Sequence, residues 1–281
     1  MKVKIISDST CDLSKELVQK YDIEVIPLYV VMNDKTLRDG IEAVPDDIYD
    51  YVSNSGNLPS TSAANLDNYL EVFQKWHNEG YAVVHFNISG EFSSSYHNAC
   101  MAAEEVGDVY VVDSRNLSTG QGLVVLHGAE MAQNGASAEE IYNSCNEITS
   151  KIEASFVIDK LDYLYKGGRC SALSAFGANL LSLKPCIEVV DGKMKPTKKY
   201  RGNFGRVITS YVSDKLKDRD DIDKHRIFIT HTKCSQEIVD DVRNKIIEIC
   251  PDFNEIIETT AGCTITTHCG PNTLGILFVR K

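Results

Sequence analysis

Hydroxyl-bearing side chains are concentrated at two places in the first third of the sequence. One is Ser60-Thr61-Ser62 and the other is Ser93-Ser94-Ser95, and both are predicted to begin a helix after a strand or loop. A helix start offers unpaired backbone N–H groups and a partial positive charge, and hydroxyl groups add donors. Two such starts at the carboxyl ends of parallel strands predict an anion-binding site. Either segment alone is also explained by ordinary helix capping, for which Ser and Thr are common.

A histidine near the end of the chain is the third group that could take part. His268 lies within residues 262–271, a stretch of glycines and threonines that we expect to be a loop before the last strand. Loops carry functional groups more often than core elements do, and an imidazole titrates near neutral pH. Ser93 and His268 could also form the nucleophile–base pair of a serine hydrolase or acyl transferase. The nucleophile elbow G-x-S-x-G is missing, however.

Other signatures of catalysis or metal binding are absent from the sequence. There is no phosphate-binding loop. Gly120-Gln121-Gly122 could begin the dinucleotide fingerprint G-x-G-x-x-G, but its last glycine is replaced by Val125. Nine cysteines without a Cys-x-x-Cys pair indicate free thiols and no zinc site, so we expect no metal and no cofactor. Asp8 could orient a group or bind a metal, and Asp8-Ser9-Thr10 is equally well explained as a turn at a strand end.

The elements that must position these groups alternate in the first half of the chain. Apolar runs at residues 3–7, 25–31, 83–86 and 109–112 predict strands. Helical patterns separate them, at residues 13–21 with Asp12 as the cap, from Pro45 onward, and at 66–76, 95–105, 119–133 and 138–152. Strands that alternate with helices predict a parallel sheet covered on both faces, in the α/β class.

The second half shows a different pattern. A short helix at 161–165 ends at Gly167-Gly168, and Asp191-Gly192 suits the turn of a hairpin that begins near residue 187. Helices at 204–216 and 237–249 and strands at 227–229, 256–257 and 274–279 follow. We expect two α/β domains, residues 1–154 and residues 155–281, because 281 residues exceed a typical single domain.

The charge is unevenly distributed along the chain. The net charge is −11, which argues against non-specific binding of nucleic acid. The segment from Lys160 to Arg206 contains ten Lys and Arg residues and only three acidic residues. This basic segment predicts either an anionic partner or a solvated Lys-rich hairpin. No run of about 20 apolar residues and no signal peptide is present, so we expect a cytoplasmic protein.

Several motifs occur together in an order that resembles a known family. They are Ile6-Ser7-Asp8-Ser9-Thr10-Cys11-Asp12, Pro59-Ser60-Thr61-Ser62, the segment from Ile88 to Tyr96, Val112-Asp113-Ser114, Gly120-Gln121-Gly122, Tyr165-Lys166-Gly167-Gly168-Arg169, Lys184-Pro185, Asp191-Gly192, Arg201-Gly202 and His268-Cys269-Gly270-Pro271. Over essentially its whole length the chain resembles the DegV family, the fatty-acid-binding proteins that serve bacterial fatty-acid kinase. The family commonly has Ser-Gly-Thr-Tyr where this chain has Ser93-Ser94-Ser95-Tyr96.

The resemblance implies a two-domain α/β fold with a buried acyl tunnel at the interface. It implies that Thr61, Ser93 and His268 bind the carboxylate of a long-chain fatty acid, while Ser94, Arg169 and Arg201 contact the head group or dock the kinase. The partner is a separate ATP-binding kinase subunit that forms the acyl phosphate for phospholipid synthesis. Transient contact with a membrane is compatible with such a carrier. Residues 172–181, mostly small or apolar, could line the tunnel or form an ordinary core helix.

Three functions therefore remain open from the sequence. The first is a fatty-acid carrier that is not itself an enzyme. The second is a serine hydrolase or acyl transferase that uses Ser93 and His268. The third is an interaction protein whose basic segment docks a partner and which holds no ligand.

Overall fold

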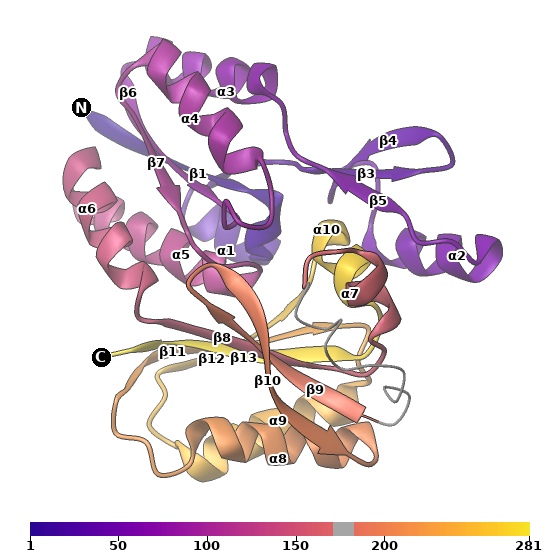
Figure 1. Ribbon diagram of the computed structural model, residues 1–281. Coiled ribbons are helices and arrows are strands. Elements are labelled where there is room, and N and C mark those ends of the chain that lie inside the picture. Colours follow the sequence, from indigo (N-terminus) through magenta and orange to yellow (C-terminus); the bar gives the residue numbers. More distant parts are fainter. Residues whose placement is uncertain (171–182) are drawn as a thin grey trace.

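A computed structural model describes residues 1–170 and 183–281 and shows two large sheets and a small third one, with helices between and around them (Figure 1). The first sheet has four strands, all parallel, in the order β2-β1-β6-β7. Its strands are β1 (Lys2–Asp8), β2 (Glu24–Ile26), β6 (Tyr81–Asn87) and β7 (Val109–Asp113). The predicted parallel sheet is thus confirmed.

Helices cover both faces of this first sheet. The helices are α1 (Lys15–Lys20), α3 (Leu66–Asn78), α4 (Ser95–Val106), α5 (Thr119–Gln133) and α6 (Ala138–Thr149). Neighbouring strand residues point to opposite faces: Ile6 and Val83 pack against α3 and α4, whereas Ile5 and Val84 pack against α5 and α6. The strands are apolar on both faces for this reason, as the sequence pattern predicted.

The start of α1 differs from the sequence-based expectation. Ser14, not Asp12, caps the helix, because the Ser14 hydroxyl accepts a hydrogen bond from Leu17 N. Asp12 instead ends a short 3₁₀ turn, η1 (Ser9–Cys11), with φ at 50°. Its carboxylate is thereby free to bond elsewhere in the fold.

The second sheet has six strands in the order β10-β9-β8-β13-β11-β12. They are β8 (Ile152–Ile158), β9 (Leu183–Val190), β10 (Lys193–Arg201), β11 (Ile222–Thr232), β12 (Glu255–Thr260) and β13 (Thr273–Arg280). The β9–β10 hairpin turns at Asp191 and Gly192, both with positive φ, and this prediction is confirmed.

Strand β8 was not expected from the sequence. We predicted that the helix from residue 138 runs to 152, but α6 ends at Thr149 and β8 begins at Ile152. Only Ile152 of this strand was predicted to be helical, and pairing with β13 and β9 holds the run Ile152–Ile158 in extended form. The proposed domain boundary at residue 154 falls inside this strand, and the division into domains stays a prediction.

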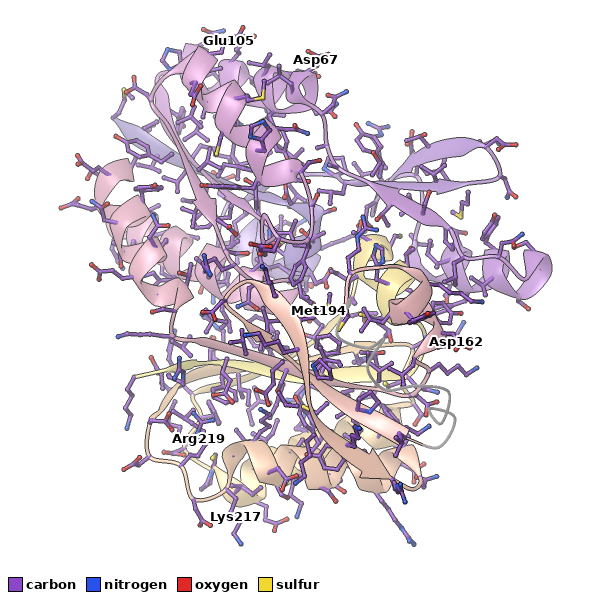
Figure 2. The ribbon with its side chains drawn as sticks, viewed as in Figure 1. Asp67, Glu105, Asp162, Met194, Lys217 and Arg219 are labelled. Atoms are coloured by element: carbon purple, nitrogen blue, oxygen red, sulfur yellow. The ribbon has the colours of Figure 1, made fainter. Side chains whose placement is uncertain are left out.

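Helix α5 packs between the two large sheets. Helices α8 (Phe204–Leu216) and α9 (Gln236–Ile249) cover the outer face of the second sheet, while α5 contacts β1 and β6 of the first sheet and β8 and β13 of the second. Its buried residues therefore run around the whole circumference of the helix, as expected for a helix packed on all sides. Met194 of β10 lies near the middle of the molecule, between its two halves (Figure 2).

A third, small antiparallel sheet stands beside the first one. It consists of β3 (Tyr29–Met32), β4 (Lys35–Arg38) and β5 (Ser60–Ser62), in the order β4-β3-β5, with α2 (Pro45–Ser55) next to it. The prediction of a helix start at Ser60-Thr61-Ser62 is wrong, because these residues pair with β3 as an edge strand. The first helical residue comes later, at Leu66, where Asn65 supplies the cap.

The segment with His268 is a helix rather than a loop. Helix α10 (Cys263–Cys269) follows β12 and packs against α7 (Asp162–Lys166), α2 and the small sheet. The loop prediction is wrong because Asp39 and Asp12 supply acceptors to the N–H groups at the start of this short helix. In the described parts of the chain, no helix is long and apolar enough to cross a membrane.

Candidate functional site

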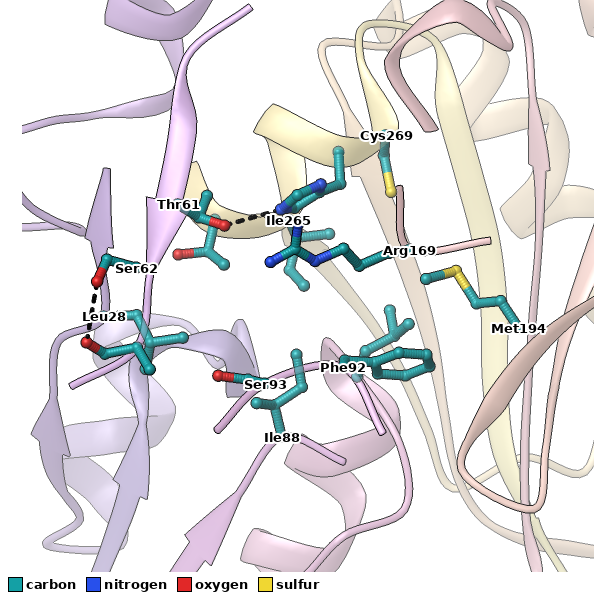
Figure 3. Close-up of a pocket in the computed structure, with 14 residues that line it drawn as sticks. Leu28, Thr61, Ser62, Ile88, Phe92, Ser93, Arg169, Met194, Ile265 and Cys269 are labelled. Atoms are coloured by element: carbon teal, nitrogen blue, oxygen red, sulfur yellow. Dashed lines mark hydrogen bonds between the residues drawn. The ribbon is translucent and has the colours of Figure 1, made fainter. Parts of the chain in front are cut away.

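A cavity of about 50 Å³ lies between the two halves of the molecule, and we call it the central cavity (Figure 3). It is lined by Leu28, Thr61, Ser62, Ala63, Ile88, Phe92, Ser93, Leu117, Arg169, Met194, Thr264, Ile265, His268 and Cys269. Thr61, Ser93 and His268, which the sequence placed in one site, all line it, and so does Arg169. The structure therefore brings together four residues from distant parts of the chain.

Thr61 and His268 are in direct contact at the cavity. The Thr61 Oγ1 atom lies 2.9 Å from His268 Nε2, so a hydrogen bond joins the edge strand β5 to α10. Figure 3 shows the Arg169 side chain reaching toward this pair, with Ser93 on the opposite side of the cavity. Polar groups thus surround a space whose remaining walls are mainly apolar.

His268 is neutral at physiological pH. Burial and the nearby positive charge of Arg169 lower the pKa of His268 to about 4. Its Nδ1 atom has no hydrogen-bond partner among the residues described. If Nε2 carries the proton and donates it to Thr61, the Thr61 hydroxyl proton is free to point into the cavity.

A glycine allows His268 to sit where it does. At Gly167 a Cβ atom would overlap His268 Nδ1, so the α7 end passes directly against the imidazole. Gly167 has an ordinary helical φ, so other residues could adopt this backbone conformation. Glycine is needed here because there is no room for a side chain. This close approach gives the Gly167-Gly168-Arg169 sequence a physical role at the site.

Two carboxylates fix the beginning of α10. Asp39 accepts hydrogen bonds from Cys263 N at 2.8 Å and Thr264 N at 3.0 Å, and Asp12 accepts one from Gly262 N at 2.8 Å. Burial raises the pKa of Asp12 to about 8, against the lowering effect of its hydrogen bond from Ser118. Sequence reasoning missed both residues in this role, and no local pattern marks them because their partners lie more than 200 residues away.

Ser93 is presented by the loop between β6 and α4. Its Oγ atom lies 2.8 Å from Ser95 Oγ and accepts a hydrogen bond from Ser95 N at 3.2 Å. His268 Nε2 is hydrogen-bonded to Thr61, and in the described residues no hydrogen bond joins His268 to Ser93. A nucleophile–base pair between Ser93 and His268 is therefore not favoured by this geometry.

The other two predicted contact residues lie outside the central cavity. Ser94 is exposed at the start of α4, and Arg201 is exposed at the end of β10. Neither is among the cavity-lining residues. A role for them in docking a partner stays a prediction.

A second, smaller cavity continues the first toward the second sheet. This inner cavity measures about 30 Å³ and is lined by Leu117, Ser118, Phe156, Thr230, His231, Thr232, Ala261, Ile265, Cys269, Thr273, Gly275 and Leu277. Leu117, Ile265 and Cys269 line both cavities and therefore form the partition between them. Burial raises the pKa of Cys269 to about 12, so its thiol is neutral and acts as an apolar wall.

A basic hollow adjoins the central cavity at the surface. It is lined by Glu91, Phe92, Gly168, Arg169, Lys193, Met194 and Lys195 and measures about 480 Å³. Phe92, Arg169 and Met194 line both this hollow and the central cavity. An anionic group in the central cavity would accordingly be approached from outside through positively charged side chains.

Two further expectations concern metals and the tunnel wall. Within residues 1–170 and 183–281, no group of three or more His, Cys, Asp or Glu side chains is arranged to hold a metal ion. The predicted apolar lining at 172–181 lies outside the described residues.

Comparison with known proteins places this architecture among relatives of similar length. A DegV domain-containing protein of Clostridium acetobutylicum is 33% identical over 100% of this chain and 99% of its own. A fatty acid-binding protein of Thermotoga maritima is 33% identical over 98% of this chain and 96% of its own. A solved structure of a DegV family protein from Thermus thermophilus, described as binding fatty acid, superposes with a TM-score of 0.90 at 26% identity, covering 100% of both chains. The family described as "Uncharacterised protein, DegV family" matches residues 2–281, and the chain therefore belongs to the DegV family.

Proposed function

We propose that this protein binds one long-chain fatty acid, with the carboxylate in the central cavity and the acyl chain directed toward the inner cavity. The observation that carries the proposal is the convergence of Thr61, Ser93, His268 and Arg169 on one space with apolar walls behind it. Relatives described as fatty-acid-binding proteins support the same ligand.

The chemistry of the two cavities suits an amphipathic acid. A carboxylate that leaves water needs hydrogen-bond donors, and the hydroxyls of Thr61 and Ser93 and the Arg169 guanidinium can supply them. Each buried methylene adds about 0.8 kcal/mol of favourable transfer free energy, so the acyl chain supplies most of the affinity. The head group then fixes the position of the ligand.

Binding must also move side chains. The two cavities together have room for only a few water molecules, far less than a long acyl chain occupies. Since Leu117, Ile265 and Cys269 separate the cavities, these are the side chains that an acyl chain would displace.

We further propose that the protein is a carrier and not an enzyme. In this proposal it presents the carboxylate to a separate ATP-dependent kinase, which forms the acyl phosphate for phospholipid synthesis in the cytoplasm. The basic hollow supports this step, because Arg169, Lys193 and Lys195 would attract the phosphates of the donor to the side of the cavity. The chain needs no cofactor of its own, and ATP binds to the partner.

The ligand is tested by extracting the purified protein with organic solvent and analysing the extract by mass spectrometry. We expect long-chain fatty acid in an amount close to that of the protein. Recovery of none, together with no binding when palmitate is added, would contradict the proposal. A serine-directed fluorophosphonate probe that labels Ser93, with labelling abolished in His268→Ala, would favour a hydrolase instead.

The carrier role needs a separate test with the kinase present. We expect acyl phosphate to form only when protein, kinase, fatty acid and ATP are combined, and calorimetry to show no tight ATP binding by this protein alone. Arg201→Ala should leave fatty-acid affinity unchanged, because Arg201 does not line the cavity, and should slow phosphorylation. Unchanged phosphorylation would remove Arg201 from the docking surface.

A further inference from the structure

A buried chain of hydroxyl groups leads from Ser93 away from the central cavity. Ser93 is partly exposed, whereas Ser95 is completely buried and lies with its Oγ 2.8 Å from Ser93 Oγ. The Ser95 hydroxyl also interacts with that of Tyr69, whose pKa it lowers. Ser95 therefore stands between two hydroxyl groups that can each accept its single proton.

The far end of this chain is a buried carboxylate. Tyr69 donates a hydrogen bond to Asp8 Oδ1 at 2.9 Å, while Asp8 Oδ2 accepts from Asn87 Nδ2 at 2.9 Å and from Ile88 N at 3.3 Å. Burial and the negative charge of Asp8 raise the pKa of Tyr69 well above its usual range. Tyr69 consequently stays protonated and donates its O–H to Asp8, while its oxygen accepts a hydrogen bond from Asn87 Nδ2 at 3.2 Å. Toward Ser95 it can act only as an acceptor.

Counting protons leaves two arrangements for Ser93. If the Ser95 hydroxyl donates its hydrogen bond to Tyr69, the Ser93 hydroxyl donates one to Ser95 and turns a lone pair toward the cavity. If Ser95 donates to Ser93, the Ser93 oxygen receives two hydrogen bonds, from the N–H and the O–H of Ser95. The Ser93 proton then has no acceptor in this chain of hydroxyls and points into the cavity.

We propose that Ser95 is a positioning residue that turns Ser93 into a hydrogen-bond donor when an anionic head group enters the central cavity. This inference rests on the proposed fatty-acid ligand. The anion selects the second arrangement, because a hydroxyl that accepts two hydrogen bonds is a stronger donor. With the ring proton on Nε2, His268 has the corresponding position behind Thr61, and each of the two hydroxyls then accepts a hydrogen bond from a second donor.

The test is a double-mutant cycle on palmitate affinity, measured by calorimetry on the wild type, Ser95→Ala, Ser93→Ala and the double variant. Ser95→Ala is expected to weaken palmitate binding about tenfold, as for one charge-assisted hydrogen bond. In the Ser93→Ala background it should cause no further loss, because Ser95 acts through Ser93. A loss of the same size in both backgrounds would overturn the inference.

Two further measurements separate this role from a structural one. The neutral analogue 1-hexadecanol should bind wild type and Ser95→Ala equally, and Ser95→Thr should restore palmitate affinity because it keeps the hydroxyl. Tyr69→Phe removes the competing acceptor and should not weaken binding. Equal losses for palmitate and 1-hexadecanol, or a tenfold loss in Tyr69→Phe with unchanged melting temperature, would contradict the inference. If wild type binds no palmitate at all, the proposed function fails, whereas binding that is insensitive to Ser95→Ala overturns only the role of Ser95.

Discussion

Thr61 and His268 are separated by 207 positions in the sequence, and their side chains are joined by a 2.9 Å hydrogen bond at the wall of the central cavity. This bond connects a small edge strand in the first half of the chain with a short helix in the second half. Both halves therefore contribute to the same candidate head-group site, and changes at either end should alter ligand binding.

Replacing Thr61 by valine tests the hydroxyl while keeping the side-chain shape. We expect Thr61→Val to weaken palmitate binding by about 1.5–3 kcal/mol, roughly 10- to 100-fold, because a hydrogen bond to a charged group is lost. Calorimetry on purified protein measures this. Ser60→Ala is the matched control, since Ser60 is exposed on the same strand and does not line the cavity. Equal effects of the two changes would remove Thr61 from the site.

The pKa of His268 predicts a specific pH dependence of stability. Folding lowers this pKa from an ordinary value of about 6.5 to about 4, so the folded state favours the neutral ring. Above pH 6.5 the ring is neutral in both states and does not reduce the free energy of unfolding. As the pH falls toward 4, the unfolded state binds a proton that the folded state does not, and the free energy of unfolding decreases. Urea unfolding should show that wild type loses up to about 3 kcal/mol more than His268→Gln over this range.

The control for this measurement is His97→Gln, because His97 is exposed on α4. We expect His97→Gln to follow the wild-type pH dependence. If His268→Gln and wild type lose stability in parallel between pH 6.5 and 4, the imidazole is not held neutral by burial.

Gly167→Ala tests the close packing beside the imidazole. The added methyl group would overlap His268 Nδ1 and should displace the ring, lowering palmitate affinity severalfold. Gly205→Ala is a suitable control, because a Cβ there would meet its neighbours only at ordinary contact distances of 3.4 Å or more. Unchanged affinity in Gly167→Ala would show that the ring position does not matter for the ligand.

Leu117→Ala tests the partition between the two cavities. Removing this side chain should join them, and the fatty acids extracted from the protein should shift toward longer chains. Leu126→Ala is the control: Leu126 is fully buried in α5 and lines neither cavity, so both variants should lose about 2–5 kcal/mol of stability. The same lipid profile in both variants would mean that the acyl chain does not pass Leu117.

Local sequence patterns predicted the regular elements well where neighbouring residues decide the local structure. The helix at 119–133 was predicted with the bounds that the structure shows, and Asp191-Gly192 identified the β9–β10 turn. The alternation of strands and helices in the first half also gave the parallel sheet. In each case the residues that decide the element lie within a few positions of one another.

Errors arose where distant partners decide the local structure. Ser60-Thr61-Ser62 is a strand because β3 pairs with it, and residues 263–269 are a helix whose first N–H groups bond to Asp12 and Asp39. The Ser93, Thr61 and His268 assignments came from residue types and from family resemblance. Asp12, Asp39 and Ser95 were missed in their roles because buried hydrogen-bond partners leave no periodic signal in the sequence.

Native mass spectrometry of the protein and of a triple variant, Thr61→Val with Ser93→Ala and His268→Ala, tests the central claim most directly. After incubation with palmitate, the wild type should gain the mass of one fatty acid, and the triple variant, folded by circular dichroism, should gain little or none. Equal occupancy in both proteins, or none in the wild type, would contradict a head-group site built from these three residues.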